Sequence, residues 1–326
     1  MHPSVSALAV VTLMACGATD PTDAWSGDRD RLLDPVPLGV PLDELPLDLA
    51  DTGLCADASC ATITTGVVPF TPRWHLWSDG ATKQRWIWVP PGAQIDNHDP
   101  DAWVFPVGTK LWKEFVRDGV RVETRYMAKY GEADDAWLFG AYEWTADGAG
   151  AVLMMDGDSD VNGTPHDIPA ARACTGCHGN TKARVLGFSL FQTDVDAAWD
   201  AGWLQTAPPA LTVPGNETEV AALGYFHANC GHCHNSKSPL INRPSLRLES
   251  GFLSSVTATK TYKTTVNVQG ATFGGATIIA KPGDPDRSII VTRMTAADPK
   301  KRMPALGIEI VDPDGLAAVR RWIQSL

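Results

Sequence analysis

Aromatic and β-branched residues alternate with charged residues along much of residues 69–155. Residues 110–116 and 120–126 both show this alternation, and a short segment with an Asp-Gly turn separates them. This pattern is typical of a β-hairpin. A second hairpin is expected within residues 136–154, around a further Asp-Gly pair. We therefore predict a Trp-rich antiparallel β domain at residues 61–156, folded as a small sandwich or barrel.

The pattern becomes helical in residues 211–326. Asn216 followed by Glu219 is typical of a capping box, and apolar residues follow this pair on a predicted helix. A short helix is expected at residues 286–294. The last predicted helix, in residues 312–326, carries its apolar residues on one face. These elements predict an all-α C-terminal domain, and hence an α+β multidomain protein.

A short apolar run at the start of the chain ends at Cys16. The run is too short to span a bilayer and predicts a signal peptide at residues 1–15. Residues 13–16 resemble a bacterial lipobox, in which the cysteine is lipidated, and Gly17 favours the outer membrane by resemblance to other lipoproteins. The alternative is an ordinary N-terminus with an unmodified cysteine. Residues 16–60 are expected to form a flexible tether.

Composition narrows the classes of function. The chain has 326 residues, which suggests two or three domains, and a formal net charge of −11. This acidic balance argues against nucleic-acid binding, which needs a basic face. Twelve tryptophans are present, eight of them within residues 74–144. They form either a packed core or a carbohydrate platform, and packing is the commoner role.

Two motifs change the picture most. Residues 174–178 and 230–234 each read Cys-x-x-Cys-His. Two thiols three residues apart on a helical turn face the same way, so they can add to the two vinyl groups of one porphyrin. The histidine that follows then points at the iron, and this is the attachment sequence of a c-type haem. We predict two covalent haems, held by Cys174, Cys177, Cys230 and Cys233, with His178 and His234 as proximal iron ligands.

The remaining cysteines fit this interpretation. Zinc would need four ligands, and the trailing histidines argue against both zinc and a thioredoxin-like pair. Of the seven cysteines, one is predicted to carry lipid and four to carry haem, which leaves Cys55 and Cys60. These two are close in sequence and are predicted to form a small structural disulfide in an oxidising compartment. A redox-active role for this pair is the alternative.

The sixth ligand of the first haem is less well defined. Residues 157–210 form the predicted first haem-binding segment, in which the apolar run 185–191 could wall a haem. His166 is the predicted sixth ligand, and an ordinary loop histidine or an open iron position are the alternatives. An open position would change the function from electron transfer to small-molecule chemistry. Other upstream candidates are Met127, Met154 and Met155.

Residues 156–167 offer a candidate calcium loop. Asp156, Asp158 and Asp160 recur at every second position, and Asp167 stands at the twelfth. This is the spacing of a calcium loop, but Val161 occupies the position that needs glycine. A solvated turn is the alternative.

Residues 218–326 resemble the class I cytochrome c domain. The resemblance comprises a helix that ends in Cys-x-x-Cys-His, a Met-Pro loop and a C-terminal aromatic helix packed across the first. It implies that Met303 is the distal iron ligand opposite His234. His/Met ligation raises the reduction potential relative to two histidines. Met294 is the competing ligand, although its helical context favours a core position.

The same resemblance implies that Gly224 lets Trp322 approach closely. The Ser-, Thr- and Val-rich insert at residues 250–280 departs from the family pattern and is expected to contain a hairpin. From about residue 69 onward, the arrangement of a β segment and two haem motifs also resembles the bacterial dihaem c-type cytochrome lipoproteins.

We therefore expect a lipid-anchored dihaem cytochrome that passes single electrons between extracytoplasmic redox proteins, periplasm-facing or at the outer membrane of a bacterial cell envelope. The haem supplies the redox chemistry. No stretch after the signal peptide is long and apolar enough to cross a membrane, so only the lipid anchors the protein. One rival is a haem enzyme, peroxidase-like or a dehydrogenase-associated subunit, with His166 and Asp167 as acid/base groups. The other is a cell-envelope binding module whose β segment binds polysaccharide.

Overall fold

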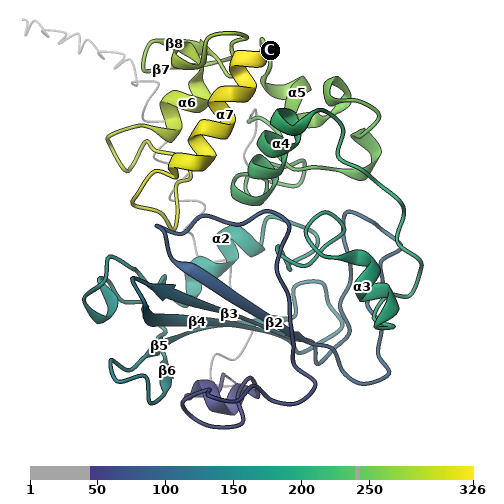
Figure 1. The fold of residues 1–326 in the computed structure, drawn as a ribbon, viewed down its shortest axis with the longest axis vertical. Helices are drawn as coiled ribbons and strands as arrows, with labels where there is room; N and C mark the ends of the chain where they lie inside the picture. The colour runs from purple at the N-terminus through teal and green to yellow at the C-terminus, as the bar shows by residue number, and fades with distance from the viewer. Residues whose placement is uncertain (1–44, 239–242) are drawn as a thin grey trace, which may run out of the picture.

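The structure is a computed structural model that describes residues 45–238 and 243–326. A six-stranded sheet lies in one half of the molecule, and most of the helices lie in the other half with a two-stranded sheet (Figure 1). The predicted signal peptide at residues 1–15 and the predicted lipid site Cys16 lie outside the described residues.

The large sheet is an antiparallel meander in which each strand pairs with the next along the chain. Both predicted hairpins are confirmed, and Arg117 pairs with Val120 at the first turn. The expected sandwich or barrel is wrong, because these strands form one open sheet. The strands are β1 (Val68–Pro69), β2 (Thr82–Trp88), β3 (Lys110–Arg117), β4 (Val120–Lys129), β5 (Trp137–Trp144) and β6 (Ala151–Leu153).

Different parts of the chain bury the two faces of this sheet. On one face, Trp86, Trp112 and Tyr126 lie in register and pack against Leu49 and Leu54. The opposite face packs against residues from as far along the chain as 248, so one core crosses all the predicted domain boundaries after residue 61. Its central row is Ile87, Leu111, Met127 and Phe139. Most tryptophans of the segment are core residues, namely Trp86, Trp103, Trp112, Trp137 and Trp144.

Residues 45–60 are packed on the sheet and do not form the expected tether. Leu49 and Leu54 are 0% and 1% exposed, and a short 3-10 helix, η2 (Leu49–Thr52), carries the first of them. A disulfide joins Cys55 to Cys60. The rest of this segment is largely polar, but burial of the two leucines holds residues 45–60 against the aromatic face of the sheet.

The expected all-α domain at residues 211–326 is wrong, because this part of the chain contains a β-hairpin. Gly274 and Gly275 both have positive φ angles, 55° and 79°, and form its turn within the Ser/Thr/Val-rich insert. In the described residues no helix has the length and apolar character needed to span a bilayer. The remaining elements are α2 (Cys174–His178), α3 (Val195–Asp200), α4 (Glu217–Asn229), α5 (Lys260–Thr265), β7 (Gln269–Phe273), β8 (Ala276–Ile278), α6 (Ile289–Met294) and α7 (Pro313–Ser325).

Helices α4 and α7 cross as expected, but through a different contact. The capping box of Asn216 and Glu219 starts α4, and Phe226 meets Trp322 of α7 edge to face at 5.5 Å. Gly224 does not face Trp322. A Cβ at Gly224 would instead overlap the indole of Trp74, which comes from the loop before β2.

The loop before β2 joins the sheet half to the helical half. The backbone N–H of Trp77 donates to Asn229 Oδ1 at 2.7 Å, and Asn229 Nδ2 donates to the carbonyl of His75 at 3.0 Å. The buried carboxylate of Asp79 accepts from the backbone N–H of Ile310 at 2.7 Å. These bonds span more than 150 positions of the chain. They fix the end of α4, and therefore the second motif, relative to the sheet.

We expect Gly224→Ala to lower the free energy of unfolding by about 2 kcal/mol, because the new methyl group overlaps Trp74. Urea unfolding measures this change. Gly251→Ala is the control, since nothing lies within 4 Å of a Cβ at Gly251. If Gly224→Ala instead stabilised the protein by the ~1 kcal/mol that helix propensity alone gives, the close contact with Trp74 would be wrong.

Candidate functional site

The first Cys-x-x-Cys-His motif forms the short helix α2, and its two thiols are free. The ring of His178 packs against Phe139 of β5, with 5.1 Å between centroids. His178 Nδ1 donates to the carbonyl of Arg184 at 2.6 Å. This bond fixes the tautomer and leaves Nε2 as the nitrogen able to bind a metal. Burial lowers the pKa of this imidazole to about 4, which keeps it neutral.

The second motif follows directly from the C-terminus of α4. The backbone N–H groups of Cys233 and His234 both donate to the carbonyl of Cys230, at 3.1 and 2.8 Å. This helical turn brings the two thiols of the motif onto one side. Burial lowers the pKa of His234 to about 4.

A hollow of about 1200 Å³, partly open to solvent, adjoins the second motif. The predicted ligands His234 and Met303 both line it, together with Cys230 and Cys233. The competitor Met294 lines it too, although this side chain is only 5% exposed and packs in the helical core.

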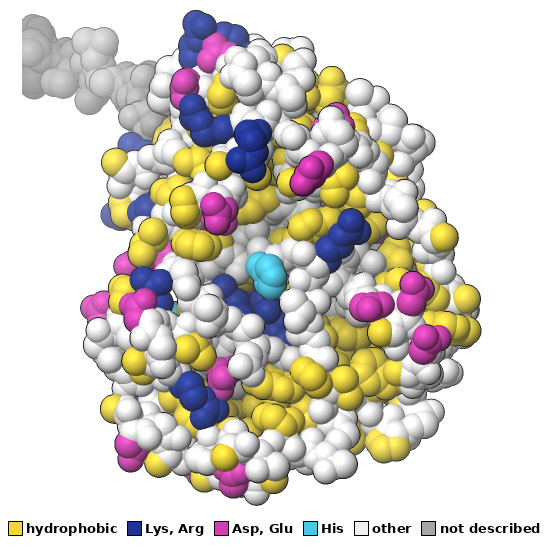
Figure 2. Space-filling model, in the orientation of Figure 1, with side chains coloured by type: hydrophobic (Ala, Val, Ile, Leu, Met, Phe, Trp, Pro, Cys, Tyr) yellow, Lys and Arg dark blue, Asp and Glu magenta, His cyan; other side chains and the backbone are white. Residues whose placement is uncertain are grey.

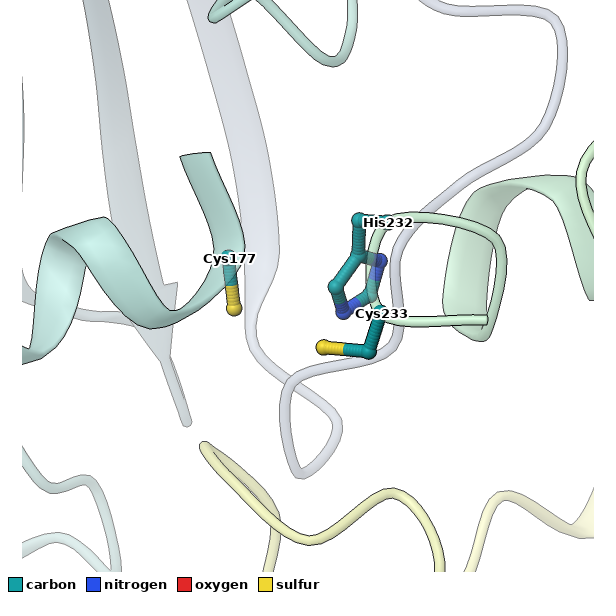
Figure 3. A group of neighbouring side chains, drawn as sticks. All are labelled: Cys177, His232 and Cys233. Carbon is teal, nitrogen blue, oxygen red and sulfur yellow. The ribbon is translucent and has the colours of Figure 1, made fainter. Parts of the chain in front are cut away.

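The two motifs meet at the boundary between the two halves. One ligand atom each of Cys177, His232 and Cys233 lie within 4.8 Å of one another. Figure 3 shows Cys177 on α2 facing the turn that carries the other two residues. The thiol of Cys233 donates to the carbonyl of Gly176 at 3.8 Å, and its interaction with the neighbouring sulfur of Cys177 holds the pKa of Cys177 well below its usual range. His232 was not predicted from the sequence, where it is a middle residue of the motif and carries no signal of its own.

The predicted sixth ligand His166 lies in a buried ion-pair chain. It is 4% exposed, and its Nε2 lies 2.9 Å from Oε2 of Glu123. The same carboxylate accepts from Arg125 Nε at 2.6 Å. The nitrogen that would bind iron is thus engaged by a carboxylate. Asp167 is exposed and accepts from the backbone N–H of Asp160, so it does not form an acid/base pair with His166.

Glu123 is the centre of this chain of charges and is 0% exposed. Burial acts to raise its pKa, but the charge of Arg125 and the hydrogen bonds from His166 and Arg125 outweigh burial and lower the pKa below its usual value. Glu123 is therefore an ionised carboxylate inside the protein. Its partners explain why a buried charge is tolerated at this position.

The aspartates of the predicted calcium loop are exposed and dispersed. Asp158 is held by a β-bridge to Ile168, and Asp156 and Asp160 are surface residues. In the part of the chain that the structure describes, the one group of three or more His, Cys, Asp or Glu side chains with converging ligand atoms is the Cys-His-Cys group. The geometry thus gives no support to a calcium site.

Lys and Arg side chains gather beside a histidine in the hollowed band between the sheet half and the helical half (Figure 2).

No protein-family model matches the chain, and no curated protein or solved structure is significantly similar to it. Any function of this site is therefore inferred from its own geometry and chemistry.

We expect Glu123→Gln to lower the free energy of unfolding by about 2–3 kcal/mol, because the substitution removes charge-assisted hydrogen bonds to Arg125 and His166. Thermal or urea unfolding at neutral pH measures the change. Glu132→Gln, at an exposed position, is the control. Equal stability of the two variants would contradict the buried ion-pair chain.

Proposed function

We propose that the protein is a dihaem c-type cytochrome that carries single electrons between extracytoplasmic redox proteins. The observation that carries the proposal is the presence of two complete Cys-x-x-Cys-His motifs side by side, with all four of their cysteines free and with Cys177 of the first lining the same hollow as the second. The side chains of the motifs fit a haem, because each motif offers two thiols for thioether bonds and one imidazole held neutral by burial.

In this proposal the residues of the chain bind and orient the two haems, which when bound supply one-electron redox chemistry. Cys174 and Cys177 hold the first, and Cys230 and Cys233 the second. His178 uses the nitrogen left free by its bond to Arg184. The hollow around the second motif, lined mainly by apolar side chains, offers Met303 as a further ligand.

The contact between the motifs favours electron transfer over chemistry on a substrate. Cys177 of one motif and Cys233 of the other are neighbours, so groups bound to them are joined through a short path inside the protein. His166 bonds to Glu123 and Asp167 accepts from the backbone N–H of Asp160, which weighs against the acid/base pair expected for the haem-enzyme alternative. Anchoring by lipid at Cys16 on the periplasmic side or at the outer membrane belongs to the same proposal.

A second candidate is a metal site formed by Cys177, His232 and Cys233. Two thiolates and one imidazole are a ligand set that zinc accepts, with water at the fourth position. The convergence of these ligand atoms within 4.8 Å favours this candidate. The metal site and the cytochrome exclude each other, because a sulfur in a thioether bond to haem is no longer a thiolate.

The first test is intact mass with an absorption spectrum, on protein made in a periplasm with haem-attachment machinery. We expect two covalent haems in the wild type. Cys174→Ala/Cys177→Ala and Cys230→Ala/Cys233→Ala should each retain one haem. Protein that carries zinc and no haem would instead support the Cys-His-Cys metal site and contradict the cytochrome.

The second test concerns Met303. We expect Met303→Ala to lower the reduction potential of one haem and to convert part of the low-spin spectrum to high-spin, because loss of the thioether leaves the iron without its distal ligand. Met294→Leu, which keeps an apolar side chain of similar volume, should change neither. A wild-type protein with one haem already high-spin would favour the haem-enzyme alternative.

A further inference from the structure

A row of cations crosses the sheet beside the first motif. Arg85 of β2 pairs with Lys113 of β3, which in turn pairs with Arg125 of β4. Neighbours in such a row have Cβ atoms about 4.5–5.5 Å apart, and like charges placed this way repel each other. Lys83 lies on the same face of β2, two residues before Arg85.

The charges converge on one aromatic ring. Lys113 Nζ, Arg125 Cζ and Lys83 Nζ lie 4.6, 4.5 and 5.9 Å from the ring centroid of Phe115. The ring offers each cation a weak attraction but no negative charge. Among the described residues, Arg125 forms an ion pair with Glu123, whereas Arg85, Lys113 and Lys83 form none. The positive charge of the row is therefore in excess.

Burial makes this excess costly. Arg85 is 7% exposed, and neither its guanidinium nor the ammonium of Lys113 forms a hydrogen bond or ion pair within residues 45–238 and 243–326. Burial, followed by the charges of Arg125 and Arg85, lowers the pKa of Lys113 well below its usual value. Unpartnered buried charges are rare unless a ligand completes them.

The row adjoins the first motif rather than the second. Cys174 packs against the hydrophobic cluster on this face of the sheet. Phe139, two residue pairs along from the row, contacts the ring of His178. The charge of Arg125 acts on Cys174, and that of Lys113 acts on His178. The cations therefore face whatever is bound to α2.

We propose that Arg85, Lys113 and Arg125 form an anion site for the two propionate carboxylates of the haem attached through Cys174 and Cys177. Planar guanidinium groups bind carboxylates through paired hydrogen bonds, and the ammonium between them adds a point charge. The assignment rests on the proposed function, since it supplies the acidic groups of a bound haem. It explains why three cations, one buried and two half-buried, stand in adjacent positions of the sheet.

The test is a redox titration of the dihaem protein and its Lys113→Met and Lys113→Arg variants. Removal of a cation beside the haem carboxylates favours the oxidised iron. Lys113→Met should therefore lower one of the two midpoint potentials, by about tenfold in the redox equilibrium constant or ~59 mV. The other midpoint potential, which Met303→Ala is expected to lower, should stay unchanged in Lys113→Met. Lys113→Arg should keep the wild-type potential, as should Lys300→Met at an exposed position. Arg85→Gln repeats the test if Lys113→Met fails to fold.

Inorganic phosphate distinguishes haem carboxylates from a free anion. At constant ionic strength, phosphate should leave the wild-type potentials unchanged, because the site is already filled. A saturable shift that is lost in Lys113→Met would make this a site for a free anion and overturn the assignment. Two attached haems with unchanged potentials in both Lys113→Met and Arg85→Gln would also overturn it. Absence of haem from the wild type would overturn the proposed function itself.

Discussion

The packing of Trp74 against Gly224 is the contact on which the geometry of the candidate site depends. It seats the loop before β2 directly on α4, and only a residue without a Cβ leaves room for the indole. Asn229, at the end of the same helix, is then bonded to the backbone of that loop at His75 and Trp77. The second motif begins one residue later, so its distance from the sheet is fixed by this contact. Since α2 packs on the sheet, the same contact brings the two motifs together.

The sheet imposes a second constraint, which is electrostatic. Register places Arg85, Lys113 and Arg125 side by side, while only Glu123 supplies a compensating buried charge. A chain selected for stability alone would gain by replacing such a row with apolar residues of similar size. The row instead lies next to Cys174. A negatively charged group bound there would offset the cost of desolvating the cations. Local stability is given up at this point of the fold, as is common at functional sites.

Local features were predictable from the sequence, and long-range ones were not. The hairpins, the α4 capping box and the two motifs depend on residues close together in the chain, so their patterns are visible. The sequence also indicated a close approach at Gly224, but the partner it suggested was wrong, because Trp74 lies 150 positions away. The hairpin expected in the insert is present, with Gly274 and Gly275 at its turn, and it makes the expected all-α domain a mixed one. The cation row was missed because alternation alone does not tell which charged face of a strand is buried.

The two motifs are identical in pattern but lie in different surroundings. The first rests on a sheet face rich in cations and beside a buried carboxylate, Glu123. The second borders a hollow lined mainly by apolar side chains, Met303 among them. The potential of a bound haem depends on its axial ligands, on burial and on nearby charge, not on the attachment sequence. If both motifs hold haem, as proposed, these different surroundings give the two haems unequal potentials. A difference in potential between adjacent sites is what gives electron transfer through a protein a direction.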